Sequence, residues 1–305
     1  MRPYSALLFA IFVWLSGCNS QSKAPALETN RVLQAQAESG NADAQYSLGR
    51  TYQNGEGATQ DYLEAAKWYR KAAEQGNLLA QSNLGYLYHD GLGVPQDFGE
   101  ALKWSRTAAE HGEVLAQAEL GLMYYNGQGV TQDYAEAVKW FRKAAEQGND
   151  AAQFNLGHMY QKGQGVTQNF VEAVKWFRKA ADAGHADAQT NLGLAYNNGQ
   201  GTAQDYFESV RWWRKAADTG HAAAQSMLGL MYEYGRGVPK DYVQAHMWLN
   251  LAASQASGNL QQDASRDRDA VAARMTRQQI EEAQRLALEW KPQLKSRTTA
   301  PPAQP

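Results

Sequence analysis

Apolar residues recur along this chain at steps of three and four positions, in segments separated by glycine-rich turns. The segment Gly40 to Gln75 is followed directly by further copies of its pattern, which begin at Gly76, Gly112, Gly148, Gly184 and Gly220. The period is 36 residues and occurs six times, without insertion or deletion. A fixed period of this length is typical of proteins built from stacked supersecondary units.

Each copy is predicted to contain two helices, which we call the A helix and the B helix. In the first copy the A helix runs from Asn41 to Gln53, and its stripe of apolar residues includes Ala44 and Leu48. The B helix starts at Asp61, a capping residue, and buries Trp68. Neither helix can bury its apolar stripe alone. The copies are therefore predicted to stack into an all-α solenoid, and no strand pattern is present.

Glycine recurs at two kinds of position in the copies. Gly49 lies inside the A helix, where glycine costs about 1 kcal/mol relative to alanine, so we expect a neighbouring helix to approach it closely. Gly55 and Gly57 are predicted to end the A helix and turn the chain. Such G-x-G turns resemble phosphate-binding loops, but these follow a helix and recur in every copy. We interpret them as structural turns.

The two ends of the repeat array are predicted to be capped. Residues 31–39 align with the second half of a B helix and are expected to form an N-terminal capping helix. The sixth B helix carries Met247, Asn250 and Leu251 where earlier copies carry Lys or Arg, which suggests that another segment covers it. Residues 256–291 are the expected cover, with a capping box at Thr276 and Gln279. Residues 292–305 are expected to be a disordered tail.

The repeated pattern A-Q-x-x-L-G-x-x-Y-x-x-G-x-G-V-x-x-D-Y-x-x-A-x-x-W-x-x-x-A-A resembles the Sel-one-like repeat, a relative of the tetratricopeptide repeat. The six copies cover residues 40–255. The resemblance implies a right-handed superhelix of antiparallel helix pairs that serves as an adaptor or scaffold. It also implies that the A helices line the concave side.

The N-terminus carries the only cysteine of the chain, Cys18. Arg2 and the apolar run from Ala6 to Leu15 have the layout of a secretory signal peptide, over residues 1–17. The sequence Leu-Ser-Gly-Cys that ends at Cys18 resembles the lipobox of bacterial lipoproteins, which implies lipidation of Cys18. Residues 18–30 are then a polar linker from the membrane to the repeats. Asn19 in place of aspartate favours the outer membrane. The alternative is a plain secreted protein with an incidental cysteine.

Composition narrows the possible chemistry. The net charge is −2, so nucleic acid is not an expected partner. No zinc-binding or Cys cluster pattern occurs, and we expect no metal site and no cofactor. His185 and His221 recur beside the glycine that opens a copy and are interpreted as loop or cap residues. The Lys/Arg stripe on the B helices is interpreted as a solvated outer face, because acidic residues lie three or four positions away.

The binding face is predicted from A-helix positions that lie opposite the buried stripe and differ between copies. Such variation is expected both for a surface that reads an irregular partner and for neutral drift on a solvent face. Aromatic and arginine side chains favour binding. The predicted contact residues are Tyr46, Arg50, Tyr86, His89, Tyr125, Phe154, His158 and Gln161.

The sequence therefore predicts a non-enzymatic, lipid-anchored scaffold of the bacterial cell envelope, facing the periplasm from the outer membrane. It would bind a protein or peptide through the concave face. The alternative is a protein that binds or hydrolyses β-lactams or peptidoglycan fragments. Ser20 to Lys23 matches the S-x-x-K motif of penicillin-binding enzymes, but it lies in the expected linker and has no K-T-G partner.

Overall fold

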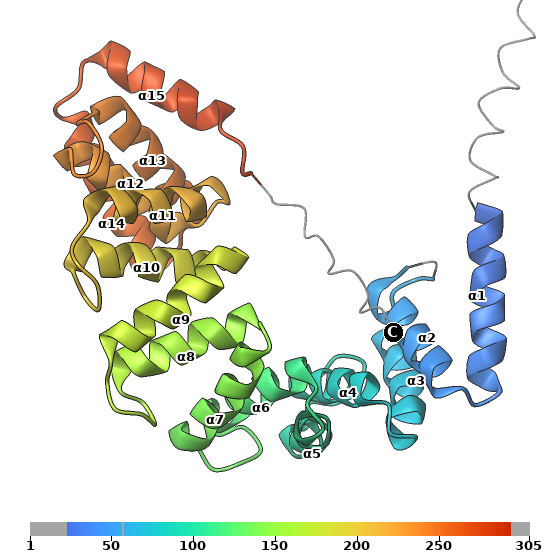
Figure 1. Ribbon diagram of the computed structural model, residues 1–305. Coiled ribbons are helices and arrows are strands. Elements are labelled where there is room, and N and C mark those ends of the chain that lie inside the picture. Colours follow the sequence, from blue (N-terminus) through green and yellow to red (C-terminus); the bar gives the residue numbers. More distant parts are fainter. Residues whose placement is uncertain (1–22, 57, 294–305) are drawn as a thin grey trace, which may run out of the picture. The chain divides into compact units, whose positions relative to one another are not determined.

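A computed structural model describes residues 23–56 and 58–293, which form helices and turns without a strand (Figure 1). The A helices are α2 (Ala42–Asn54), α4 (Leu78–Asp90), α6 (Val114–Asn126), α8 (Asp150–Lys162), α10 (Ala186–Asn198) and α12 (Ala222–Tyr234). The B helices are α3 (Tyr62–Glu74), α5 (Phe98–Glu110), α7 (Tyr134–Glu146), α9 (Phe170–Ala183), α11 (Tyr206–Asp218) and α13 (Tyr242–Gln255). The remaining helices are α1 (Lys23–Glu38), α14 (Gly258–Ala272) and α15 (Arg277–Glu289). The prediction of an all-α fold is confirmed for these residues.

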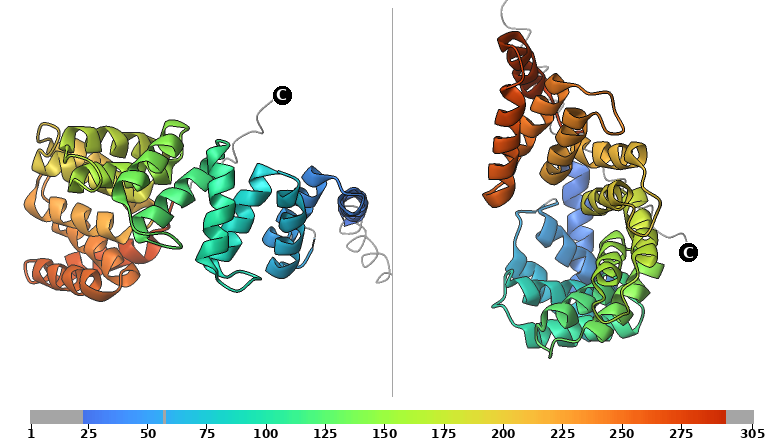
Figure 2. Two further views of the ribbon diagram at one scale, coloured as in Figure 1. Left: turned by 90° about the horizontal axis from the view of Figure 1, so that it is seen from below. Right: turned by 90° about the vertical axis from the view of Figure 1, so that its left-hand side faces the viewer.

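The chain forms two compact units, residues 1–133 and 134–305, which are described separately. Helices α1 to α6 belong to the first unit, and α7 to α15 belong to the second. Within each unit, consecutive A and B helices pack against each other, and Figure 2 shows these pairs from two further sides. Inside a unit, each A helix therefore contacts the helix that precedes it, and the A helices α2, α4, α8, α10 and α12 also contact the B helix of their own copy.

The helix boundaries follow from local capping. Asp61 accepts hydrogen bonds from the backbone N–H groups of Leu63 and Glu64, which satisfies two donors that have no partner inside α3. Gly55 ends α2 in the left-handed conformation, with φ of 72°, and its N–H donates to the carbonyl of Thr51. Side-chain caps of the same kind begin α5, α9, α11 and α13, and a left-handed glycine ends every later A helix, so the G-x-G segments are turns, as predicted.

The second glycine of the turn also touches the preceding copy. Gly165, between α8 and α9, has φ of +68° and lies directly on the backbone at the start of α7. A Cβ atom at this position would lie 2.7 Å from the nitrogen of Ala135 and closer still to the carbonyl of Tyr134. Glycine is required here both for its backbone angle and for the space it leaves.

The glycine inside the A helices α2, α4, α8, α10 and α12 allows the close approach that the sequence predicted. A Cβ atom at Gly85 of α4 would lie 3.2 Å from the backbone nitrogen of Ser105 and 3.3 Å from the carbonyl oxygen of Ala101, both on α5. In the second unit, a Cβ atom at Gly157 would lie 2.8 Å from the ring of Phe177. The cost of a helical glycine is offset by the contact between the two helices of one copy.

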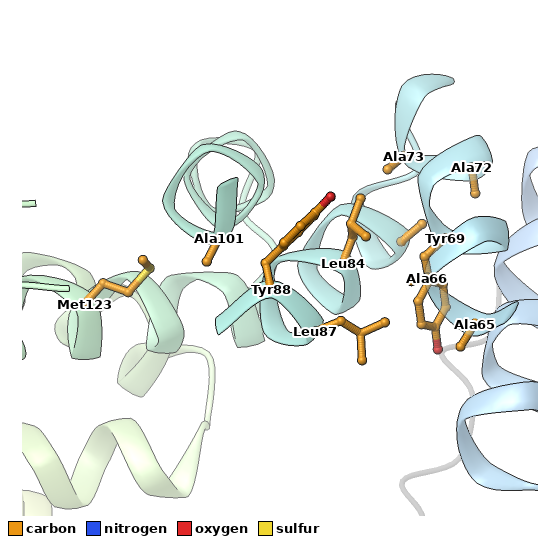
Figure 3. Close-up of a cluster of buried hydrophobic side chains, with 11 residues drawn as sticks. Ala65, Ala66, Tyr69, Ala72, Ala73, Leu84, Leu87, Tyr88, Ala101 and Met123 are labelled. Atoms are coloured by element: carbon orange, nitrogen blue, oxygen red, sulfur yellow. The ribbon is translucent and has the colours of Figure 1, made fainter. Parts of the chain in front are cut away.

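Small residues alternate with large ones in the core of each unit. In the first unit, Figure 3 shows Tyr69, Leu84, Leu87, Tyr88 and Met123 among alanines of α3 and α5. In the second unit the largest fully buried side chains include Trp212 and Trp213, which are 1% and 2% exposed. The alanines let the helix axes come close, and the large side chains fill the space that remains between them.

A buried glutamine joins each A helix to the helix before it. The Nε2 atom of Gln81 in α4 donates to the carbonyl of Ala73 at the end of α3, at 3.1 Å. Equivalent hydrogen bonds of 3.0 to 3.2 Å are made by Gln45, Gln117, Gln153, Gln189 and Gln225. Each of these carbonyls also accepts from the backbone N–H three residues later, as Ala73 does from Gly76 at 3.0 Å, so the glutamine adds a second donor and ties the two helices together, which explains the repeated A-Q pair.

The Lys/Arg stripe of the B helices is mostly exposed, as interpreted from the sequence, but its arginines also join adjacent copies. Arg106 Nη2 in α5 donates to the hydroxyl of Tyr124 in α6 at 3.1 Å. The same bond, 18 residues apart, links four further pairs: Arg70 with Tyr88, Arg142 with Tyr160, Arg178 with Tyr196, and Arg214 with Tyr232. The sequence did not reveal these bonds because the tyrosine belongs to the next copy.

Helix α13 is covered by α14 and α15. Met247 and Leu251, the uncharged residues of the sixth B helix, are each 6% exposed. Asn250 stands where earlier copies carry the bonding arginine, and it accepts a hydrogen bond of 3.3 Å from Arg268 of α14. Donor and acceptor have thus exchanged places at the end of the array.

Helix α1 begins at Lys23, so it is longer than the expected capping helix of residues 31–39, and part of the expected 18–30 linker is helical. Pro25 is compatible with this start because N–H groups of a first helical turn have no partner inside the helix. Ala37 is 1% exposed and packs with Ala44, Leu48 and Trp68. The second half of α1 therefore takes the place of a B helix before the first copy.

Candidate interaction face on the A helices

Each A helix begins at an N-cap residue whose side chain accepts a hydrogen bond from the first turn. In four copies Asn or Glu is the N-cap, and in the last two it is His185 and His221, whose Nδ1 atoms accept from Ala188 N and Ala224 N at 3.3 Å. The interpretation of these histidines as cap residues is confirmed. Three positions per copy, five, nine and twelve residues after the cap, carry the side chains that the sequence predicted as contacts.

The eight predicted contact residues fall in both units. Tyr46, Arg50, Tyr86, His89 and Tyr125 belong to the first unit, and Phe154, His158 and Gln161 belong to the second. The structure therefore gives two groups of A-helix residues, each on its own unit. All eight lie on A helices, and their surroundings differ.

Two of the predicted residues pack against the B helix of their own copy. The ring of Tyr46 lies 5.9 Å from that of Tyr69, and Phe154 lies 5.9 Å from Phe177 and stacks on His185 at 4.8 Å. These contacts hold an A helix against its own B helix and against the cap of the next A helix. Both side chains are only partly accessible, so their first role is packing.

The remaining residues of the second unit are half-buried. His158 lies 6.5 Å from Phe154, ring to ring, and burial lowers the pKa of His158 below its ordinary value. Gln161 accepts a hydrogen bond at its backbone carbonyl from Gln168 Nε2 at 2.9 Å. This part of the face is held in place by contacts inside its own copy.

The first unit exposes more of its A-helix side chains. Arg50 is exposed, and Tyr125 is half-buried. Tyr86 is 40% exposed, and a hydrogen bond to Asp90 raises the pKa of its hydroxyl. His89 lies 2.6 Å from Asp90 Oδ1, measured from Nδ1, and 3.6 Å from Glu119 Oε1 on α6. These distances bring α4 and α6 together around two carboxylates.

The sequence missed four residues of this face. Asp90 and Glu119 complete the cluster around His89, and Leu79 and Leu115 are exposed apolar residues at one position of α4 and α6, at 45% and 59%. Glu119 could have been noticed, because the other copies carry Ser47, Asn83, Asn155, Asn191 and Met227 at its position.

Burial sets the charge state of this cluster. Burial raises the pKa of the Glu119 carboxyl, and the nearby His89 only partly opposes this. Burial also disfavours the charged form of His89, but its hydrogen bond to Asp90 and the charge of Glu119 outweigh that effect and raise its pKa. The carboxylate of Glu119 is therefore held in a site with too few hydrogen-bond donors.

The B-helix side carries two open depressions, of about 440 Å³ over α3 and about 420 Å³ over α7. Their side chains are paired among themselves: Lys67 lies 2.5 Å from Glu64, and Lys71 lies 4.0 Å from the centre of the Trp68 ring. Lys143 covers Trp140 in the same way, at 4.0 Å. This surface already satisfies its own charges, unlike the cluster on α4 and α6.

The described residues offer neither a metal site nor a membrane-spanning helix. Within residues 23–56 and 58–293, no three His, Cys, Asp or Glu side chains come together so that they could hold a metal ion. None of the helices that the structure describes is both long and apolar enough to cross a membrane. The signal peptide and Cys18 lie outside the described residues.

Comparison with solved structures finds several similar chains. A Sel1 repeat protein from Oxalobacter formigenes is 30% identical, with a TM-score of 0.66 over 79% of this chain and 98% of the other. The protective antigen c5321 of uropathogenic Escherichia coli, described as displaying an SLR fold, is 34% identical over 85% and 70% of the two chains, with a TM-score of 0.39. A putative Sel1 repeat protein from Klebsiella pneumoniae is 25% identical over 65% and 97%, with a TM-score of 0.45. Comparison with curated proteins gives no match.

The family scan matches the Sel1 repeat to six consecutive segments, residues 42–77, 78–113, 114–149, 150–185, 186–221 and 222–257. These segments are the copies that the sequence revealed, shifted by two residues. Sel1 repeat solenoids generally act as protein-interaction scaffolds and are typically non-catalytic. The resemblance noted in the sequence is thereby confirmed, and the chain belongs to the Sel1 repeat family.

Proposed function

We propose that this protein is a non-enzymatic, lipid-anchored scaffold of the bacterial cell envelope that binds a protein or peptide through the face of its A helices, the face that the sequence predicts to be concave. Cys18 would carry the lipid, and the chain would face the periplasm from the outer membrane. The general role of Sel1 repeat proteins as interaction scaffolds supports the first part of the proposal. The lipobox-like sequence around Cys18 supports the second.

The observation that carries the binding role is the exposure of large side chains on α4 and α6. Leu79, Tyr86 and Leu115 are 45%, 40% and 59% exposed on two A helices that contact each other. Large apolar side chains gathered on one face of a folded unit are a common mark of an interaction site. Tyrosine adds a rigid contact at low entropic cost.

The binding face can be tested in cells with a photo-crosslinking amino acid. We expect the same envelope protein to be captured from positions 79, 86 and 115 and identified by mass spectrometry. Phe207 of α11 is the matched control, because it is an apolar residue, 76% exposed, on a B helix. Capture from position 207 alone, or from none of the four positions, would contradict the proposed face.

The anchor is tested independently with the Cys18→Ala variant. We expect the unchanged protein to incorporate a clickable palmitate analogue and to fractionate with membranes. The variant should lose both properties while its circular dichroism spectrum stays helical. Equal labelling of the two proteins would disprove the lipid anchor and leave the binding face untouched. Binding of β-lactams or peptidoglycan fragments is an alternative that no contact in residues 23–56 and 58–293 favours.

A further inference from the structure

The face of α4 and α6 combines apolar side chains with two carboxylates. On α4, Leu79, Tyr86 and Asp90 follow one another at steps of seven and four, which places them along one side of the helix. On α6, Leu115 and Glu119 are four residues apart. The 3.6 Å approach of His89 to Glu119 joins the two rows at their acidic end.

These carboxylates differ from the glutamates in the first turn of the B helices. Glu64, Glu100 and Glu172 on the B helices each pair with a lysine three residues later, at 2.5, 3.2 and 2.9 Å. Within residues 23–56 and 58–293, Asp90 and Glu119 have no lysine or arginine within ion-pair distance, and their only cationic neighbour is His89. The acidic end of this face is thus short of positive charge.

Glu119 is also short of hydrogen-bond donors. Its side chain is 18% exposed, and Oε1 is buried without a hydrogen-bond partner. The Nε2 atom of His89 is buried without one as well. A buried carboxylate oxygen without a donor is unfavourable, so an incoming N–H group that reached it would gain a strong, charge-assisted bond.

The chain itself shows how an A-helix carboxylate accepts an arginine from outside the repeats. Glu233 of α12 is 4% exposed, and its Oε1 lies 2.9 Å from Nη1 of Arg274. Arg274 lies in the connection between α14 and α15, beyond the sixth copy. At the last copy the face is therefore already occupied by a guanidinium group, whereas in the first unit the corresponding side of α4 and α6 carries none.

We propose that the α4–α6 face binds a peptide segment whose arginine side chain lies beside His89 and pairs with the carboxylates of Asp90 and Glu119, while neighbouring aliphatic residues of the segment lie on Leu79 and Leu115. The planar guanidinium can donate to two carboxylates at once, which an ammonium group matches less well. The proposal rests on the proposed function, since it names the chemistry of the partner that this face selects.

The test uses the full-length protein and arrays of short synthetic peptides. The central residue is arginine, lysine, citrulline or leucine, and the flanking positions are a degenerate mixture of leucine, alanine, serine and glycine. Citrulline keeps the shape of arginine without its charge. We expect the arginine set to bind at least about tenfold more strongly than the citrulline set, as one charge-assisted contact predicts.

The matched variants are Glu119→Gln and Glu110→Gln. Both remove one negative charge from the first unit, but Glu110 is an exposed residue of α5, away from this face. Glu119→Gln should abolish the preference for arginine over citrulline, and Glu110→Gln should leave it unchanged. Asp90→Asn should weaken the preference as well, and circular dichroism would verify that each variant is folded.

The possible results separate the two proposals. Peptide binding with no preference for a basic centre, or a preference that survives Glu119→Gln, would overturn the arginine site while the peptide-binding face stands. A stronger signal from the lysine set than from the arginine set would overturn the guanidinium assignment. Binding of no peptide set would count against the proposed function and the arginine site together.

Discussion

The turn glycine that touches the preceding copy allows a quantitative test of how the copies hold together. Gly165 needs a positive φ and also has the backbone of Tyr134 and Ala135 where a side chain would be. Gly148 needs a positive φ as well, +92°, but has no atom within 4 Å of a built Cβ. Both belong to the second unit. Gly148→Ala therefore measures the conformational cost alone, and Gly165→Ala measures that cost plus the steric cost.

The expected magnitudes follow from these two situations. A left-handed backbone costs an alanine about 1–2 kcal/mol, so Gly148→Ala should lower the free energy of unfolding by that amount. Forcing a methyl group into a packed contact costs about 1–3 kcal/mol more. Because the obstacle is backbone, it cannot rotate away as a side chain would. Gly165→Ala should thus be about 2–5 kcal/mol less stable than the unchanged protein.

Urea unfolding followed by circular dichroism provides the measurement. The two variants and the unchanged protein should unfold with similar slopes, so that differences in the midpoint report differences in the free energy of unfolding. Equal midpoints for the two alanine variants would show that the start of α7 moves aside without cost. That result would refute the argument that close backbone contact joins successive copies at this turn.

Three other predictions concern side-chain contacts. Arg178→Ala should destabilise by about 1–2 kcal/mol, because it removes the hydrogen bond to Tyr196, whereas Lys175→Ala should change the free energy of unfolding by less than about 0.5 kcal/mol in the same urea assay. Burial lowers the pKa of His246, so its contribution to stability is present above its unfolded pKa and is lost as the pH falls. The melting temperature of His246→Val should therefore depend less on pH between 7.5 and 5 than that of the unchanged protein. An unchanged slope of melting temperature against pH would contradict this. Burial raises the pKa of Glu119, so its ionisation destabilises the fold as the pH rises. The stability of Glu119→Gln relative to the unchanged protein should therefore increase from pH 4 to pH 7. A difference that is independent of pH would argue against a buried charge.

Much of the fold could be predicted from the sequence, because each copy repeats the same local signals. Asp61 and its equivalents mark the start of a B helix, and Gly55 marks the end of an A helix, through hydrogen bonds to residues only two to four positions away. Gly49 indicated a close helix contact because glycine is unfavourable inside a helix without such a reason. Met247 and Leu251 pointed to a cover, and α14 and α15 lie there.

The interaction face was less predictable, because its properties depend on pairs of helices. Phe154 looked exposed on its own helix, but Phe177 and His185 enclose it from another helix and another cap. Glu119 gained its significance only when the structure placed His89 beside it. The start of α1 was missed for a different reason: polar residues and Pro25 do not mark a helix by pattern, although a first turn tolerates them.

The arginine–tyrosine bond between copies also bears on how such a protein can change in evolution. Because the bond joins a B-helix arginine to the tyrosine 18 residues later in the next A helix, the B helix of one copy could make the same bond to the A helix of any other copy. Unequal recombination within the gene could then add or remove whole copies without requiring a new interface, and the protein could adjust its length to its partner. Addition of a copy after the sixth one is different, because there Asn250 of the B helix is the acceptor and Arg268 of the following helix is the donor. A further standard copy placed there would meet an asparagine instead of an arginine, so this junction fixes where the series ends.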